Sequence, residues 1–208
     1  MEILSLKKYK GTTYEVELDN GKKLYLHIDV IVDFGLKAGM QIERARLREI
    51  VYASNFRRAY QYSLYCLDRR DYSAEDIFQK LMDTYKNEEL CLNVVRKLAR
   101  ADLINDVRYA EKLAAKLVET KKFGYYRALR EMTAKGLERD TAMEALEKYS
   151  EVYSENLAEL IEKKHSRSLT DSGDRKSVEK VKNALVRYGY GFDEVNKAVR
   201  EYFEQLEG

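Results

Sequence analysis

The stretch Tyr72–Leu81, YSAEDIFQKL, decides the fold, because it is echoed 51 positions later by Phe123–Met132, FGYYRALREM. The echo extends to single apolar positions: Val95 is matched by Leu146 at the same offset, and by Val199 after 53 more residues. A period of this length encodes one supersecondary unit, which buries its apolar face only by stacking on a neighbour. The sequence therefore predicts stacked helical units.

We expect a mainly α fold with three tandem three-helix repeats in a curved, elongated helical array, preceded by a small N-terminal β-hairpin unit. Apolar positions alternate before Ile42 and follow a period near 3.6 after it. The predicted segments are the β unit at 1–53 and repeats at 55–104, 105–150 and 151–207. Within the last repeat, the small polar residues at 166–174 predict a flexible loop.

The β unit is predicted from two alternating runs, Tyr14–Leu18 and Lys23–His27, that flank an Asn20-Gly21 pair. Asn-Gly between alternating runs is a strong hairpin signal, since both turn residues of the favoured turn need positive φ. The apolar run Ile28–Phe34 is compatible with a third strand or a short helix. An isolated hairpin is marginally stable, so this unit is expected to pack on the helices.

Two apolar stripes define the predicted helices on either side of the repeat junction. Ser73, Asn105 and Asp106 are side chains that can cap helix N-termini. The predicted buried stripe before Ser73 consists of Tyr62, Leu64, Tyr65 and Leu67. The predicted buried stripe after Asp106 consists of Ala110, Leu113, Ala114, Leu117 and Val118.

The composition is that of a charged globular protein. Of the 208 residues, 36% are charged and 45% apolar, and the absence of proline permits long helices. Cys66 and Cys91 form no CxxC motif, so we expect buried thiols in a reducing compartment. The N-terminal sequence lacks a signal-peptide pattern and no run has the length of a membrane span, which predicts a cytoplasmic protein.

Side chains that would support catalysis are not clustered in the sequence. His27 and His165 are the only histidines and stand in unrelated segments, so no zinc site is expected. Gly189-Tyr190-Gly191 resembles part of a phosphate loop, but no strand precedes it and no Lys-Ser/Thr follows. We therefore expect no enzyme activity, no metal and no cofactor.

Basic side chains provide the candidate contacts. Net charge is only +2, yet residues 112–139 hold eight basic and three acidic side chains. Cations bind phosphates and neighbouring tyrosines can stack on bases, so an anionic partner is one interpretation; a solvated helical surface is the other. The candidates recur near the edges of the predicted repeats: Arg57, Arg58, Arg69, Arg70, Arg96, Lys97, Arg100, Lys121, Lys122, Arg127 and Arg130.

Three segments resemble the RecX family of bacterial regulatory proteins, which modulate the RecA recombinase. Arg70–Leu81 is similar to the first-repeat signature of that family, and Ala101–Ala110 to its Gly-Leu-Leu/Ile-Asp/Asn-Asp-x-Arg-Tyr-Ala junction. Phe123–Gly136 is similar to a later segment, although Tyr125 and Tyr126 replace a common proline and basic residue. The positions that carry the resemblance are Tyr72, Ser73, Leu81, Asp106, Arg108, Tyr109, Ala110, Gly124 and Gly136.

The resemblance implies a function. It implies a protein of DNA recombination, DNA repair and the SOS response that lies in the groove of the RecA–DNA filament. Such a protein suppresses the ATPase, recombinase and coprotease activities of RecA and contacts single-stranded DNA within the filament or DNA directly. We expect a monomer without membrane contact. The residues themselves leave open which face binds and whether modulation is inhibitory or facilitating.

Two alternatives compete with the filament modulator. An independent DNA-binding protein would place a helical unit in a groove of bare duplex. A helical scaffold for a protein partner would tolerate charge reversal at Lys122, Arg127 and Arg130.

Overall fold

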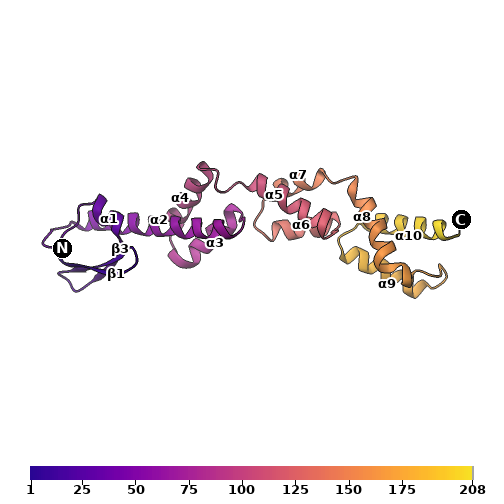
Figure 1. Cartoon of the computed structure of the whole chain (residues 1–208), viewed down its shortest axis with the longest axis horizontal. Helices are drawn as coiled ribbons and strands as arrows, with labels where there is room; N and C mark the ends of the chain where they lie inside the picture. Colours follow the sequence, from indigo (N-terminus) through magenta and orange to yellow (C-terminus); the bar gives the residue numbers. More distant parts are fainter. Residues whose placement is uncertain (208) are drawn as a thin grey trace. The chain divides into compact units, whose positions relative to one another are not determined.

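The structure is a computed structural model that describes residues 1–207 (Figure 1). It is mainly helical with a small N-terminal sheet, as predicted. The strands are β1 (Ile3–Lys10), β2 (Thr13–Leu18) and β3 (Lys23–His27). The helices are α1 (Ile28–Asp33), α2 (Arg44–Arg69), α3 (Ala74–Tyr85), α4 (Glu88–Arg100), α5 (Asp106–Ala115), α6 (Tyr125–Thr133), α7 (Arg139–Glu147), α8 (Val152–Leu160), α9 (Arg175–Arg187) and α10 (Phe192–Glu207). Shorter turns are the π-helical η1 (Lys116–Thr120) and η2 (Ile161–His165), and the 3₁₀ turn η3 (Ser166–Ser168).

The chain forms two compact units. Unit 1 comprises residues 1–72 and 76–104, and unit 2 comprises residues 73–75 and the chain from Asn105 onward. The expected division into three repeats stays a prediction. No helix within residues 1–207 is both long and apolar enough to cross a lipid bilayer.

The predicted hairpin is confirmed, but its turn differs from the expected one. The three strands pair antiparallel in the order β1-β2-β3. Only Gly21 in the turn has positive φ, 76°, and its N–H donates to the Leu18 carbonyl at 2.9 Å. The Lys22 N–H donates to Asn20 Oδ1 at 3.0 Å. The loop is thus longer than two residues, so one left-handed glycine suffices and Asn20 need not adopt positive φ.

The first strand and the first helix complete the N-terminal unit. The sequence prediction missed β1, whose register with β2 shifts near Ser5 and Lys10 and disrupts the alternation. The run after β3 is a helix, α1, because the Nδ1 of His27 accepts the Asp29 N–H and caps it.

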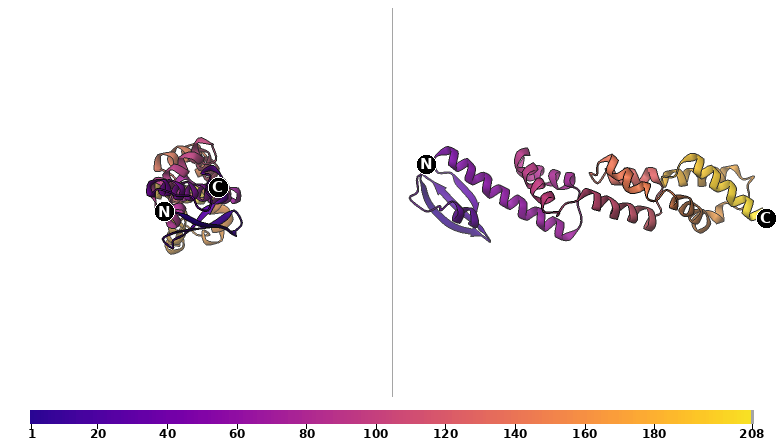
Figure 2. Two further views of the ribbon diagram at one scale, coloured as in Figure 1. Left: turned by 90° about the vertical axis from the view of Figure 1, so that its left-hand side faces the viewer. Right: turned by 90° about the horizontal axis from the view of Figure 1, so that it is seen from above.

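Helix α2 spans the expected boundary between 53 and 55. It runs without interruption through that point, away from the sheet (Figure 2). Ser54, inside the helix, is buried and its Oγ accepts the backbone N–H of His27 at 2.9 Å. Ile50 lies in the same apolar core as Val16 and Leu26 of the sheet. The strands therefore use α2 as their cover and form no separate domain.

The predicted apolar stripe of α2 is wrong. Tyr62 and Tyr65 are 41% and 58% exposed, whereas Ala59, Ser63 and Cys66 are buried. The Ser63 hydroxyl is satisfied locally, since it donates to the Ala59 carbonyl at 2.9 Å. Small side chains thus form the buried face of α2 in this segment, and the two tyrosines lie on its exposed face.

In unit 2, helices from the second and third predicted repeats share one hydrophobic core. Ala110, Ala114, Leu117 and Val118 are buried there as predicted, while Leu113 is only half-buried. Leu169 is fully buried in the same core, and η3 precedes it. The segment 166–174, expected to be a flexible loop, is thus anchored at Leu169, whereas 167, 168 and 170–174 are exposed.

Candidate nucleic-acid interface

Two glycines bring the start of α6 against the end of α9. The Gly124 N–H donates to the Tyr188 carbonyl at 3.0 Å, and the Tyr126 N–H donates to the Gly189 carbonyl at 3.1 Å. The first donors of one helix thereby satisfy carbonyls at the C-terminal end of another. Gly189 has φ of 103°, a conformation that favours glycine. This crossing fixes the position of Arg127, in the first turn of α6.

The residues that carry the resemblance near the predicted repeat junction make hydrogen bonds or pack in the core. The Ser73 hydroxyl donates to the Lys135 carbonyl at 2.7 Å, beside Gly136, whose φ is 76°. Asn105 caps α5 by accepting the Arg108 N–H at 2.9 Å. Asp106 instead accepts the Ala74 N–H at 2.9 Å. Tyr109 packs against the core of unit 2, Ala110 is fully buried in it, and in unit 1 Leu81 is fully buried.

A cluster of cations and aromatic rings surrounds the crossing; we call it the α6–α9 cluster, formed by Lys121, Phe123, Arg127, Lys164 and Tyr188. The two rings meet edge-on with centroids 5.5 Å apart. The guanidinium of Arg127 lies 3.9 Å from the Phe123 centroid, and the ammonium of Lys164 lies 5.0 Å from that of Tyr188. Lys121 lies 5.4 Å from Phe123. The rings thus position three cations on one site.

Lys122 is turned away from this cluster into the body of unit 2. Its ammonium donates to Asn156 Oδ1 at 2.7 Å and pairs with Glu159 at 2.9 Å. Its carbonyl accepts the Tyr190 hydroxyl at 2.9 Å, and its φ is 56°. Lys163 and then Lys122 lower the pKa of Glu159 to about 2. These bonds make Lys122 a structural residue of unit 2.

Arg130 and Tyr126 lie on the outer surface of α6. Arg130 is exposed, and its guanidinium has no ion-pair partner within residues 1–207. Tyr126 is 65% exposed and meets Tyr125 edge-on at 5.5 Å. Both side chains are accessible to a partner.

In unit 1, the first two candidate arginines hold α2 to its neighbours. Arg57 pairs with Asp29 and lies 3.9 Å from Asp33, both on α1. The guanidinium of Arg58 donates to the Tyr25 carbonyl at 3.0 Å, at β3. These contacts already occupy both arginines.

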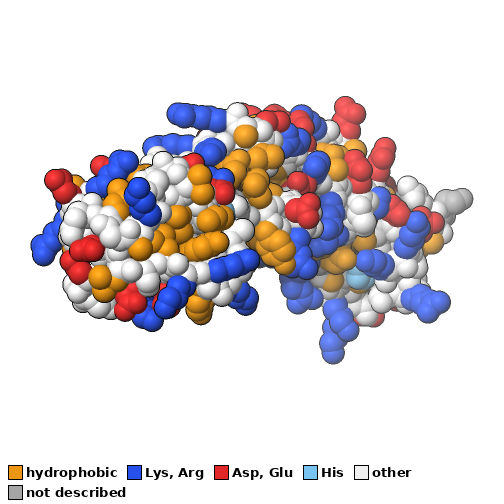
Figure 3. All heavy atoms as spheres, turned by 60° about the vertical axis from the view of Figure 1, so that its left-hand side comes forward, with side chains coloured by type: hydrophobic (Ala, Val, Ile, Leu, Met, Phe, Trp, Pro, Cys, Tyr) orange, Lys and Arg blue, Asp and Glu red, His pale blue; other side chains and the backbone are white. Residues whose placement is uncertain are grey.

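Three of the other candidates of unit 1 lie on aromatic rings. Arg69 donates to the Tyr65 hydroxyl at 2.6 Å, and Arg70 lies 4.1 Å from the centroid of Tyr72. Lys97 lies 4.6 Å from the Tyr60 centroid. Arg96 and Arg100 are exposed one turn apart on α4. Figure 3 shows lysine and arginine interspersed with apolar side chains on the surface.

Several residues of these sites were not predicted from the sequence. Lys164 and Tyr188 belong to the α6–α9 cluster but stand 37 and 61 positions after Arg127. No local signal joins them, because the crossing of backbones brings them together. Tyr60 and Tyr72 belong to aromatic–cation pairs whose cations were predicted without their rings.

The histidines and cysteines stand apart from any metal-binding cluster within the described chain. No set of three His, Cys, Asp or Glu side chains there could hold a metal ion. His27 is buried as a helix cap, and burial followed by Lys164 lowers the pKa of His165. Both cysteines are buried free thiols, and burial raises the pKa of Cys91.

Fold and site together define a class: a mainly helical protein with a small antiparallel sheet and with cations that lie on the faces of aromatic rings. Comparison with known proteins shows which proteins this chain resembles. The chain is 25% identical to the regulatory protein RecX of Bacillus velezensis over 95% of this chain and 75% of that one. It is 25% identical to RecX of Clostridium acetobutylicum over 97% and 95% of the two chains.

Solved structures agree with these relatives. A crystal structure of regulatory protein RecX superposes with a TM-score of 0.70 at 23% identity, covering 96% of this chain and 98% of that one. RecX from Lactobacillus salivarius superposes with a TM-score of 0.65 at 26% identity, covering 72% and 97%. No protein-family model matches the chain. Over most of its length the chain is thus similar to RecX regulatory proteins in sequence and in fold.

Proposed function

We propose that this protein binds the RecA–DNA filament and lowers its ATPase, recombinase and coprotease activities, acting in the cytoplasm as a monomer without catalysis of its own. Similarity to regulatory proteins named RecX supports the regulatory role. One structural observation carries the proposal of a nucleoprotein partner: candidate cations in both units lie on the faces of aromatic rings.

A cation on an aromatic face suits phosphate binding. The ring holds the cation in place, so less side-chain freedom is lost when a phosphate binds. Release of counterions from DNA then drives association and makes it salt-dependent. The same tyrosines offer stacking faces to unpaired bases. In the α6–α9 cluster three cations share two rings, which gives the densest such arrangement among the candidates.

The proposal is tested by RecA ATPase on single-stranded DNA with added protein. The wild type should lower the rate at amounts stoichiometric with RecA. The double variant Arg96→Glu/Arg100→Glu should do so only at higher concentration. Its matched control is Lys176→Glu/Lys180→Glu, which reverses two exposed lysines at the same spacing on α9. Unchanged ATPase with the wild type would contradict the proposal.

Direct DNA binding is the second candidate function, favoured by the exposed ring–cation pairs Arg69–Tyr65 and Arg70–Tyr72. It predicts duplex binding without RecA, tighter than about 1 μM near 100 mM salt and weaker as salt rises. Fluorescence anisotropy of labelled duplex measures this. Weaker binding, together with intact ATPase suppression, would favour the filament modulator.

A further inference from the structure

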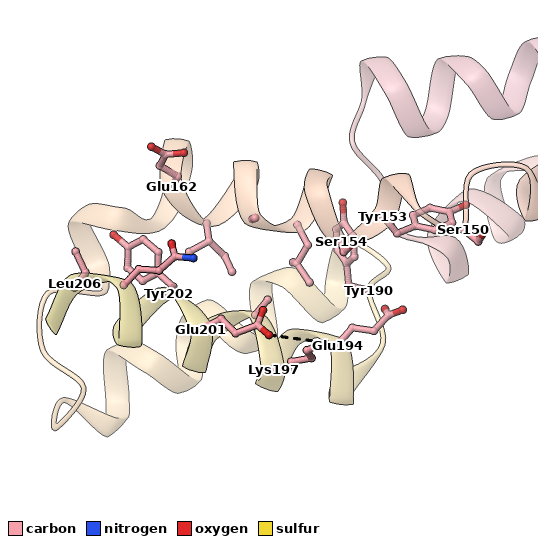
Figure 4. A pocket seen from close by; sticks show the side chains of 15 residues that line it. Ser150, Tyr153, Ser154, Glu162, Tyr190, Glu194, Lys197, Glu201, Tyr202 and Leu206 are labelled. Carbon is pink, nitrogen blue, oxygen red and sulfur yellow. Dashed lines mark ion pairs between the residues drawn. The ribbon is translucent and has the colours of Figure 1, made fainter. Parts of the chain in front are cut away.

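A groove of about 540 Å³ lies between α8 and α10 of unit 2, and none of the candidate basic residues lines it (Figure 4). Its floor is apolar and tyrosine-rich, and is formed by Tyr153, Leu157, Ala158, Ile161, Tyr190 and Tyr202. A groove of this volume is within the range of ligand sites in proteins. Helix α10 supplies one wall and α8 with η2 the other.

The rim of the groove is acidic. Glu162 stands on one wall, and Glu194 and Glu201 stand on the other (Figure 4). The one lysine on the rim, Lys197, lies 3.7 Å from Glu201 in an ion pair. Three glutamates against one lysine leave an excess of negative charge, which repels phosphate. This surface is therefore electrostatically opposite to the candidate nucleic-acid interface.

One buried polar atom lies at the end of the groove without a partner. Tyr153 is 8% exposed, and its hydroxyl makes no hydrogen bond within residues 1–207. It lies at the end marked by Ser150 (Figure 4). Buried polar groups are normally paired, so an unpaired hydroxyl in a groove wall is a place where a bound group can donate or accept.

We propose that this groove binds an amphipathic helix of a partner protein, with its apolar residues on the tyrosine-rich floor and its lysines or arginines against the glutamate rim. Apolar residues spaced i, i+3, i+4 and i+7 would fit such a groove. Charge complementarity selects a basic helix over an acidic one. The proposal does not depend on DNA or RecA binding, and its test includes neither.

The probe is a synthetic leucine–lysine helix of about 15 residues that carries one tryptophan. The chain has no tryptophan, so the indole fluorescence reports on the peptide alone. Titration with the full chain should shift that emission to shorter wavelength as the indole enters the groove. A leucine–glutamate peptide of the same pattern should bind at least about tenfold more weakly.

Two pairs of variants locate the binding. Ala158→Tyr fills the groove and should weaken peptide binding about tenfold, whereas Ala99→Tyr, on an exposed position of α4, should not. Glu162→Lys/Glu201→Lys should weaken it as well, and Glu179→Lys, an exposed glutamate of α9, should leave it intact. Circular dichroism confirms that each variant is folded.

Three outcomes would overturn the proposal. They are equal affinity for the basic and acidic peptides, full affinity in Ala158→Tyr, and light scattering showing that the wild type but not Ala158→Tyr forms dimers. The last result would identify a second copy of the chain as the occupant.

Discussion

The backbones of Gly124 and Gly189 touch: a Cβ on Gly124 would lie 2.3 Å from the Gly189 carbonyl carbon. A Cβ on Gly189 would in turn lie 2.3 Å from Cβ of Arg127. Neither position has room for a side chain, which gives a physical reason for glycine at both. The same contact holds the ring and the cation of the α6–α9 cluster against each other.

Gly124→Ala should therefore destabilise the protein. Overpacking against backbone costs about 1–3 kcal/mol, because backbone atoms cannot rotate away. Urea denaturation followed by circular dichroism measures the loss. Gly173→Ala is the control, since its nearest neighbour, at 3.1 Å, is a side-chain oxygen of Asp171 and not a backbone atom. Equal stability of the two variants would show that the crossing relaxes freely.

Two buried tyrosines should respond oppositely to loss of the hydroxyl. Tyr190→Phe removes a bond to the Lys122 carbonyl and should cost about 0.5–1.5 kcal/mol of unfolding free energy. Tyr153→Phe removes a hydroxyl that has no partner within the described residues, so it should be neutral or slightly stabilising. Urea denaturation of both variants measures the change in unfolding free energy. A cost at Tyr153 as large as at Tyr190 would mean that its hydroxyl is bonded in solution.

Glu159 should make part of the stability depend on acid pH. Its pKa falls from 4.5 to about 2 on folding, because Lys163 and Lys122 bond the carboxylate. A depressed folded pKa contributes stability that is present above the unfolded pKa and is lost as pH falls from about 4.5 toward 2.

The test compares the wild type with Glu159→Gln. The wild type should be the more stable at pH 6, and the difference should shrink by pH 3. Glu179→Gln, at an exposed position of α9, should show no such trend. A difference that is constant with pH would argue against the ion pairs.

Charge reversal should distinguish Lys122, a structural residue, from Arg130, a candidate binding residue. Lys122→Glu places a carboxylate beside Glu159 and should lower the unfolding free energy by about 1–3 kcal/mol. Arg130→Glu should leave stability unchanged and weaken suppression of RecA ATPase by up to about tenfold. Thermal melts and the ATPase titration are both needed. A large fall in melting temperature for Arg130→Glu would assign it a structural role.

The sequence predicted elements where hydrophobicity and turn chemistry agree. The hairpin around Gly21 and the buried positions Ala110 and Leu117 are of this kind. The prediction of the buried face of α2 was wrong, because that face consists of small residues such as Ala59 and Ser63. A pattern of large apolar side chains does not reveal such a face. Close helix approach is a tertiary property, and the periodicity of α2 did not show it.

The candidate site was likewise predicted only in part from the sequence. Residue type identifies every cation, but the partner of each one is fixed by the fold. Asp29 stands 28 positions before Arg57, and Asn156 stands 34 positions after Lys122. No local pattern distinguishes these bonded cations from the exposed Arg130. Ion pairing at long range therefore decides which basic residues remain available.

The glycine crossing also has a consequence for synthesis on the ribosome. Helix α6 obtains its backbone partners from residues 188 and 189, near the end of the chain. Domains fold as units and N-terminal ones fold first during translation. The elements of unit 1 are complete by residue 104, about halfway through the chain. The core of unit 2 also contains Val195 and Val199, so it can form only after these residues have emerged, and the helices that precede them are synthesised before their final neighbours.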